Sequence, residues 1–190
     1  MEHTSKYLRV RRTLKAIRYA FYKLVLEKNY SDISITELTE RAEINRKTFY
    51  LHYSSLEDLV QEVEQEIADS ILENIHFSAE NLDVAGCVST FYHYLDECSE
   101  VQQKLLCDSH YHFFYEDVTN VVLQSDAFST FFSLTEHPDI VRSFSISITY
   151  IYRDWVKNNR PIPLEDLIEY ASKLILSGYS GIVDKSKMES

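Results

Sequence analysis

The sequence ISITELTERAEINRKTFYLHYSSLEDL occupies residues 33–59 and carries the signals that decide the fold. Ser34 followed by Glu37 has the spacing of a capping box, in which the serine oxygen accepts from the Glu37 amide and the glutamate reaches back to the Ser34 amide. The box predicts a short helix over about 35–42. An asparagine N-cap then predicts a second short helix over 46–52. Two short helices with a tight connection predict a helix-turn-helix.

Apolar residues at three- and four-residue spacing predict long helices on both sides of this segment. A helix over 6–28 is expected to bury the stripe Val10, Leu14, Ile17, Phe21, Leu24 and Val25. Downstream, a second capping box, Ser54 with Glu57, opens a helix that runs to about residue 75.

The rest of the chain has the same helical pattern. Helices are expected at about 82–98, 100–107, 110–124 and 126–134. Two final stripes run from Ile140 to Trp155 and from Leu164 to Ile182, and prolines between them end the first. The expected fold class is therefore all-α, with about nine helices: a three-helix head with the helix-turn-helix, followed by a helical body.

Composition excludes several other classes of protein. The 190 residues include only three glycines and three prolines, too few for the turns of a β-sandwich or for a glycine-rich phosphate loop. The three cysteines contain no CxxC pair, which argues against a disulfide framework or a cysteine zinc site. The sequence has neither an apolar run of transmembrane length nor the apolar stretch of a signal peptide. We therefore expect a cytoplasmic protein that does not bind a membrane.

The formal charge of -11 is unevenly distributed. Residues 1–53 contain eleven Lys and Arg against six Asp and Glu, a net charge of +5, so the remainder carries -16. A basic end on an acidic chain is typical of a protein that binds a polyanion. A well-solvated helix face explains the charge alone equally well.

Residues 8–63 resemble the DNA-binding head of the TetR/AcrR family of transcriptional regulators. The resemblance rests on the isoleucine-rich start of the first short helix, the alanine near its end, the stretch FYLHY and the acidic-plus-leucine start of the following helix. The stretch NRKTFYLHY is especially similar to the subgroup of dihydroxyacetone-operon regulators. Two positions differ from the family: Glu43 stands where a glycine is usual in the turn, and Leu56 stands where a lysine usually contacts a phosphate.

The resemblance implies a DNA-binding domain over 1–54 and a helical regulatory and dimerisation domain over 55–190. In a helix-turn-helix the second helix enters the major groove, where arginine and lysine donate to guanine and a threonine methyl contacts thymine. The predicted DNA-binding residues are Thr36, Asn45, Arg46, Lys47, Thr48, Tyr50 and His52. Phe49 is expected to be buried as the anchor of the head. The basic N-terminal residues Lys6, Arg9, Arg11 and Arg12 either reach the DNA backbone or form a solvated face.

The last two helices are the expected homodimer surface, because each has a long apolar stripe and the final one carries small residues. The predicted interface residues are Ile148, Ile151, Trp155, Leu167, Ala171, Leu174 and Gly178, with Ser172 and Gly181 as further small residues. Stripes that face only the core of their own chain are the alternative. Two heads about one DNA turn apart, ~34 Å or a small multiple, would read a palindrome.

The middle of the chain is dense in aromatic residues, and the resemblance implies an effector site there for a small apolar or aromatic molecule. The predicted pocket residues are Phe91, Tyr92, Tyr111, Phe114, Tyr115 and Phe128. A filled aromatic core is the alternative that the sequence leaves open.

One segment is rich in residue types that bind metal ions: Cys107, Asp108, His110, His112, Glu116 and Asp117. His112 and Glu116 are i,i+4 neighbours on a helix. However, no HExxH motif occurs, a single helix seldom supplies a closed site, and no GxSxG motif occurs. We therefore expect no enzyme activity, no metal site and no cofactor.

These features predict a transcriptional regulator, a repressor rather than an activator, that binds palindromic double-stranded DNA as a homodimer and responds to a small-molecule effector. The alternative is a protein of the same fold that docks another protein as a co-regulator and binds no operator itself.

Overall fold

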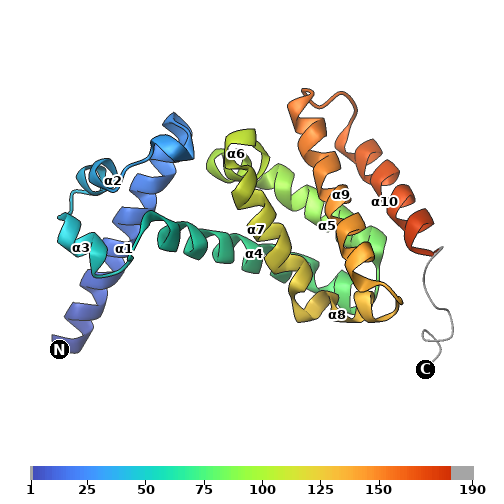
Figure 1. The fold of residues 1–190 in the computed structure, drawn as a ribbon, viewed down its shortest axis with the longest axis horizontal. Helices are drawn as coiled ribbons and strands as arrows, with labels where there is room; N and C mark the ends of the chain where they lie inside the picture. The colour runs from blue at the N-terminus through green and yellow to red at the C-terminus, as the bar shows by residue number, and fades with distance from the viewer. Residues whose placement is uncertain (1, 181–190) are drawn as a thin grey trace. The chain divides into compact units, whose positions relative to one another are not determined.

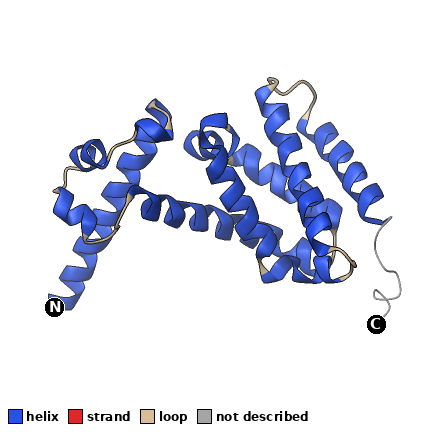
Figure 2. Ribbon diagram, viewed as in Figure 1, coloured by secondary structure: helices blue, strands red, loops and turns tan. Residues whose placement is uncertain are grey.

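The computed structural model describes residues 2–180 and confirms the all-α prediction (Figure 2). Within that range the chain forms ten α-helices and two short 3-10 helices, with no strand. The elements are α1 (Glu2–Glu27), η1 (Tyr30–Asp32), α2 (Ile35–Arg41), α3 (Arg46–Tyr50), α4 (Leu56–Glu80), α5 (Val84–Glu97), α6 (Glu100–Cys107), η2 (Ser109–Tyr111), α7 (His112–Gln124), α8 (Asp126–Ser133), α9 (Pro138–Lys157) and α10 (Leu164–Ser180). No described helix has both the length and the apolar character needed to span a lipid bilayer.

The first predicted capping box is only half formed. The Ser34 hydroxyl accepts from the Glu37 amide at 3.2 Å, as predicted. The glutamate does not turn back to Ser34, because both carboxylate oxygens lie 2.8 Å from Nζ of Lys28 at the end of α1. A carboxylate gains more from an ammonium group than from a neutral amide, so the Glu37 side chain joins α2 to the residue that follows α1 instead of capping its own helix.

The second predicted capping box, Ser54 with Glu57, is wrong by one residue. The Ser55 hydroxyl accepts from the Asp58 amide at 3.2 Å, and the Asp58 carboxylate accepts from the Ser54 amide at 2.7 Å. The hydrogen bond from the Ser54 amide is the largest cause that lowers the pKa of Asp58. A charged aspartate at this position also interacts favourably with the N-terminus of α4.

The chain divides by its internal contacts into two compact units (Figure 1). The first unit, the head unit, consists of residues 2–64 and 99–114, and the second, the body unit, consists of 65–98 and 115–180. The predicted functional boundary at residue 54 stays a prediction. The compact units do not follow this boundary, because residues 99–114 from the middle of the sequence pack with the N-terminal helices.

In the head unit, α1 packs against both α2 and α6. Ile17, Ala20, Phe21, Leu24 and Val25 of α1 are fully buried. Val10 was expected in this stripe but is 36% exposed, so the packed part of α1 begins later than the sequence pattern predicts. The rings of Tyr30 and Phe113, 4.8 Å apart, add a second contact between the N-terminal helices and the returning segment.

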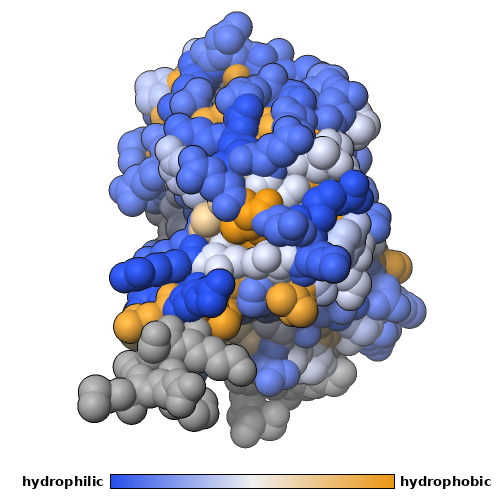
Figure 3. All heavy atoms as spheres, turned by 90° about the vertical axis from the view of Figure 1, so that its left-hand side faces the viewer, coloured by the Kyte–Doolittle hydropathy of each residue, from blue (hydrophilic) through white to orange (hydrophobic). Residues whose placement is uncertain are grey.

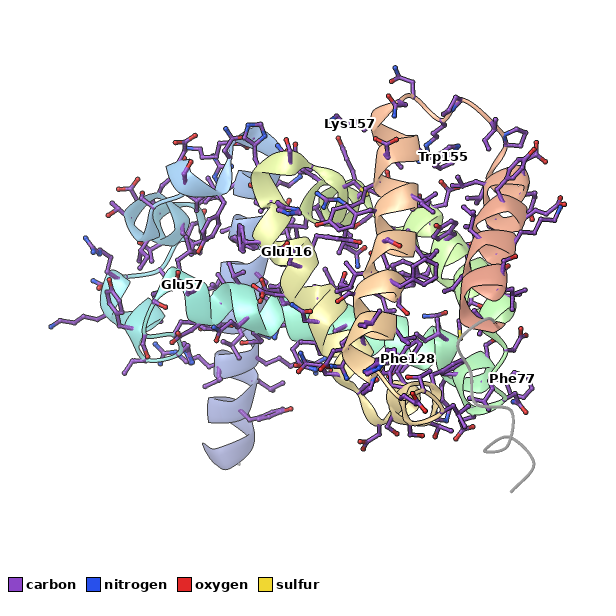
Figure 4. All side chains as sticks on the ribbon, turned by 45° about the vertical axis from the view of Figure 1, so that its right-hand side comes forward. Glu57, Phe77, Glu116, Phe128, Trp155 and Lys157 are labelled. Atoms are coloured by element: carbon purple, nitrogen blue, oxygen red, sulfur yellow. The ribbon has the colours of Figure 1, made fainter. Side chains whose placement is uncertain are left out.

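In the body unit, α10 packs most extensively on α5, and α9 packs on α8 and α10. The hydroxyl of Tyr92 in α5 donates to the carbonyl of Ile148 in α9 at 2.6 Å. The indole of Trp155 donates to the Ile162 carbonyl at 2.9 Å and closes the turn between α9 and α10. Figure 4 labels Trp155 in this unit and Phe77, whose side chain is 76% exposed at the surface.

Candidate nucleic-acid interface

Helix α2 ends in a Schellman motif that creates the turn of the helix-turn-helix. The Ile44 amide donates to the Thr39 carbonyl at 3.0 Å, and the Glu43 amide donates to the Glu40 carbonyl at 3.1 Å. Glu43 adopts φ 53°, the left-handed conformation that this motif requires and that glycine adopts most easily. The turn therefore keeps the glycine geometry although a glutamate occupies it.

Helix α3 is fixed at its start by Asn45. The Asn45 side-chain oxygen accepts from the Lys47 amide at 2.8 Å, which satisfies one of the amides that a helix N-terminus leaves without a partner. The bond leaves the side-chain NH2 group of Asn45 as a donor. Asn45 therefore caps α3, its predicted contact with DNA stays a prediction, and Arg46 and Lys47 follow it on the first turn.

Phe49 anchors α3 to the head and is fully buried, as predicted. Its ring centroid lies 5.6 Å from that of Tyr50, edge to face, and 5.5 Å from that of Tyr53. Tyr53 is also buried, and burial raises its pKa to about 12, so its phenol stays neutral at physiological pH. The anchor leaves Tyr50 47% exposed on the outer side of α3.

The structure places the predicted DNA-binding residues on exposed or partly exposed positions of α2 and α3. Thr36, Asn45, Arg46, Lys47 and Tyr50 are exposed, whereas Thr48 and His52 are half-buried. Arg46 and Lys47 form no ion pair with any carboxylate in the part of the chain that the structure describes. Their charges are thus available to an external anion. Figure 3, which views the molecule from the side of the head helices, shows a mostly hydrophilic surface.

Leu51 is a candidate that the sequence interpretation missed. It follows Tyr50 directly at the end of α3 and is 79% exposed, the most exposed large apolar side chain described. An apolar side chain beside exposed cations can contact the methyl group of a thymine. Its position inside FYLHY, between two predicted contact residues, was the signal that could have identified it.

Two cations of the head, Arg41 and Arg18, are paired with carboxylates and join its helices. Arg41 of α2 lies 2.5 Å from Glu27 of α1, and Arg18 of α1 pairs with Glu62 of α4. The Arg41 guanidinium holds the pKa of Glu27 below its usual value. Arg41 and Arg18 thus stabilise the head, whereas Arg46 and Lys47 remain available to bind an anion.

The predicted pocket residues fall into both units. Tyr111 and Phe114 belong to the head unit, and the Tyr111 hydroxyl donates to the Lys28 carbonyl at 2.8 Å. Phe91, Tyr92, Tyr115 and Phe128 belong to the body unit. There the Arg153 guanidinium carbon lies 4.2 Å from the ring centroid of Tyr115. A pocket lined by the six residues together stays a prediction.

The predicted dimer residues divide by exposure. Ile148, Trp155, Leu167 and Ala171 are buried within this chain, and Ile151 is half-buried. Leu174 is 58% exposed, and Gly178 is exposed beside the ring of Phe144, where an added Cβ would lie 2.9 Å from Phe144 Cζ. Gly181 lies outside the described residues. The apolar stripes of α9 and α10 thus serve mainly the core of the same chain, and a narrower set remains on the surface.

The segment rich in metal-binding residue types makes local contacts. The Asp108 carboxylate accepts from the His110 amide at 2.8 Å and lies 2.8 Å from His110 Nδ1. Among the described residues, no three His, Cys, Asp or Glu side chains converge as metal ligands.

Comparisons with known proteins agree with the helix-turn-helix and the fold. No family model matches the chain. An uncharacterised HTH-type transcriptional regulator of Bacillus subtilis, YxbF, is 37% identical over 68 residues, which are 35% of this chain and 18% of that protein. The chain thus spans less than a fifth of the length of this curated relative.

Two solved structures have the same fold. A TetR transcriptional regulator from Streptococcus agalactiae superposes with a TM-score of 0.71 over 91% of this chain and 98% of that chain, at 20% identity. The dihydroxyacetone kinase operon activator DhaS superposes with a TM-score of 0.51 over 90% and 98% of the two chains, at 22% identity. With ten α-helices over residues 2–180 and a helix-turn-helix at α2 and α3, the chain has the fold of the TetR transcriptional regulators.

Proposed function

We propose that this protein is a transcriptional regulator that binds palindromic operator DNA as a homodimer, with α3 of each protomer contacting the DNA. The observation that carries the proposal is the pair of exposed cations, Arg46 and Lys47, on the first turn of a helix that Asn45 and Phe49 hold in a helix-turn-helix. In this motif the first turn of the second helix meets the base edges of the major groove. Tyr50 and Leu51 extend the same exposed segment to the end of α3.

Each of these side chains has a chemistry suited to DNA. Arg46 and Lys47 donate to guanine N7 and O6 or to phosphate oxygens. The Tyr50 and His52 side chains and the hydroxyl of Thr36 are chemically able to donate to phosphates, and such contacts set the register of a helix in the groove. A single head offers few contacts and binds weakly and with strong salt dependence. Two heads in one molecule are needed for specific binding.

The dimer surface we propose is the exposed apolar part of α9 and α10. Phe144 is 37% exposed and lies against Gly178, while Tyr170 and Leu174, one helical turn apart on α10, are 63% and 58% exposed. The absence of a side chain at Gly178 lets the Phe144 ring lie close to α10. Pairing this surface with its copy gives a four-helix contact that buries these side chains.

The proposed outcome of binding is repression. Occupancy of an operator is sufficient to block a promoter, whereas activation needs an additional contact with the transcription machinery. An effector binds the body unit more tightly when the two heads of the dimer have one spacing than when they have another. The difference between these two affinities limits how far the effector can change DNA binding. A small apolar or aromatic molecule suits the aromatic side chains of the body unit, Phe91, Tyr92, Tyr115 and Phe128.

The experiment that tests the proposal compares DNA binding by the full chain and two variants. Lys47→Ala and Tyr50→Ala are each expected to weaken binding by about 1 to 3 kcal/mol. The Lys47 side chain is exposed, so Lys47→Ala is expected to leave the melting temperature unchanged, whereas Tyr50→Ala also removes the ring contact with Phe49 and is expected to lower the melting temperature slightly. Lys157→Ala in the body unit is the matched control, because it also removes one exposed lysine. Equal binding by all four proteins would contradict the assignment of α3.

The dimer is tested separately by light scattering after size-exclusion chromatography. Leu174→Glu places a charge on the proposed surface and is expected to give a monomer with unchanged helix content. Leu51→Glu, which also replaces an exposed leucine, is expected to remain a dimer. A Leu174→Glu protein that elutes as the same dimer would exclude this surface.

A further inference from the structure

The N-terminal part of α1 carries a set of cations that the helix-turn-helix does not use. From residue 3 to residue 26 this helix contains no acidic residue, although the chain has 30 of them. In the same range it contains seven cations: Lys6, Arg9, Arg11, Arg12, Lys15, Arg18 and Lys23. A helix without compensating carboxylates presents a continuous positive potential along its exposed side.

The cations of α1 differ in whether a carboxylate pairs with them. Arg18 pairs with Glu62, so its charge is used inside the head unit. Arg11, Arg12 and Lys15 are exposed and pair with no carboxylate among the described residues. At 100° per residue these three side chains fall within about a third of the helix circumference. They therefore form one basic face.

Most side chains in the same part of α1 are exposed. Tyr7 is 65% exposed, Leu8 45% and Val10 36%, whereas Ile17 and the following core residues of α1 are fully buried. Figures 1 and 4 show the N-terminal turns of α1 extending beyond α3 in the head unit. We call residues 7–15 the α1 arm. At 1.5 Å per residue the arm is about 13 Å long, which is roughly two and a half helical turns.

We propose that the α1 arm binds the phosphate backbone of duplex DNA outside the half-site that α3 contacts. This inference rests on the proposed function, because it assumes that α3 brings the head to DNA. Duplex DNA is the occupant that fits, since its phosphates are regularly spaced anions and the arm belongs to the same compact unit as Arg46 and Lys47. The arm adds affinity and lengthens the contacted DNA, and it reads no bases.

The experiment uses the full chain and two duplexes: one limited to the palindrome that the protein selects, and one with ten more base pairs on each side. Arg11→Gln/Arg12→Gln removes two cations from the arm. Lys23→Gln/Lys157→Gln removes two exposed lysines outside it and is the charge-matched control. Dissociation constants are measured over a series of salt concentrations, and the protected DNA is mapped with hydroxyl radicals.

The wild-type chain and the control are expected to bind the long duplex more tightly than the short one. The arm variant is expected to lose that gain and to bind the long duplex roughly 10-fold more weakly near physiological salt, with a salt slope lower by about 0.9 for each lost phosphate contact. Its protected region is expected to shorten at both ends while its preferred palindrome stays the same.

Three outcomes would overturn the inference. An arm variant with wild-type slope and footprint shows that the arm does not contact DNA, and it leaves the proposed function intact. An equal loss in the control shows that only the net charge matters. Failure of the wild-type chain to bind either duplex at low salt overturns the proposed function and this inference together.

Discussion

The hydroxyl of Tyr111 in η2 donates a hydrogen bond to the carbonyl oxygen of Lys28, just beyond the end of α1, across 2.8 Å. These residues are 83 positions apart in the sequence, and Tyr111 is fully buried. Burial raises the pKa of the Tyr111 phenol to about 12, so the donor is protonated throughout the physiological range. The bond joins the residue that follows α1, ahead of the helix-turn-helix, to the short helix η2 that follows α6.

Removing this hydroxyl is expected to destabilise the head unit. Tyr111→Phe keeps the ring and leaves the Lys28 carbonyl without its buried donor, at a cost of about 1 to 2 kcal/mol in the free energy of unfolding. Tyr7→Phe removes a hydroxyl from an exposed side chain and is expected to change nothing. Urea unfolding of the two variants measures the difference. Equal stability would mean that the bond does not contribute in solution.

Glu43 is expected to limit the stability of the turn. Glu43→Gly relieves the cost of φ 53° in a residue with a side chain, and we expect the free energy of unfolding to rise by about 1 kcal/mol. Glu40→Gly makes the same chemical change inside α2, where it is expected to lower stability by about 1 kcal/mol. Thermal unfolding of both variants shows whether each substitution raises or lowers the stability of the protein. Destabilisation by Glu43→Gly would show that the turn does not adopt this conformation.

Leu51 is expected to contact a thymine methyl. Leu51→Ala is expected to weaken operator binding by about 1 to 2 kcal/mol, because apolar contact area is lost, without a change in folding stability, because the side chain is 79% exposed. Replacing each thymine of the operator in turn by deoxyuridine removes one methyl group. At the contacted position, wild type and variant should bind the substituted duplex equally well. A constant difference at every position would exclude the contact.

His93 is expected to link α5 and α10 in a pH-dependent way. Its Nδ1 lies 2.8 Å from the Ser89 carbonyl and its Nε2 lies 3.1 Å from the Glu165 carboxylate, so both ring nitrogens face acceptors and the charged form is favoured. The hydrogen bond to the Ser89 carbonyl, followed by Glu165 and Glu97, raises the pKa of His93 above 6.5. The stabilisation is therefore fully present below about pH 6.5 and is lost as the pH rises through the raised pKa.

Glu165→Gln tests this link. We expect the variant to titrate His93 at a lower pH than wild type, as followed by the imidazole proton signals in an NMR titration. Its stability deficit should be largest below pH 6.5 and should shrink at higher pH. His76, an exposed histidine on α4, serves as the internal reference because the substitution does not touch it. An unchanged His93 titration would mean that the carboxylate does not act on the ring.

Local signals predicted most of the helices, because caps and apolar spacing act within a few residues of each other. Asn45 identified the start of α3, and the last two stripes identified α9 and α10. The partners of Glu37 and Asp58 were not predictable in this way. Glu37 binds Lys28, which follows α1, and a capping pattern shifted by one residue fits the sequence before α4 equally well.

Long-range packing could not be predicted from spacing. An apolar stripe shows that one side of a helix avoids water, but it does not show whether the same chain or a second copy covers it. Trp155 and Ala171 were expected at a dimer surface and are buried by their own chain. Tyr111 bonds to the Lys28 carbonyl just beyond the end of α1, a contact for which the sequence carries no local signal.

Selection of bound duplexes from a random pool by the full-length protein tests the central claim most directly. We expect the enriched sequences to share a palindrome whose half-sites are a fixed distance apart, one DNA turn or a small multiple of it, because two copies of α3 read the same bases in opposite directions. A pool without enrichment, or one enriched in a single unpaired site, would contradict the account.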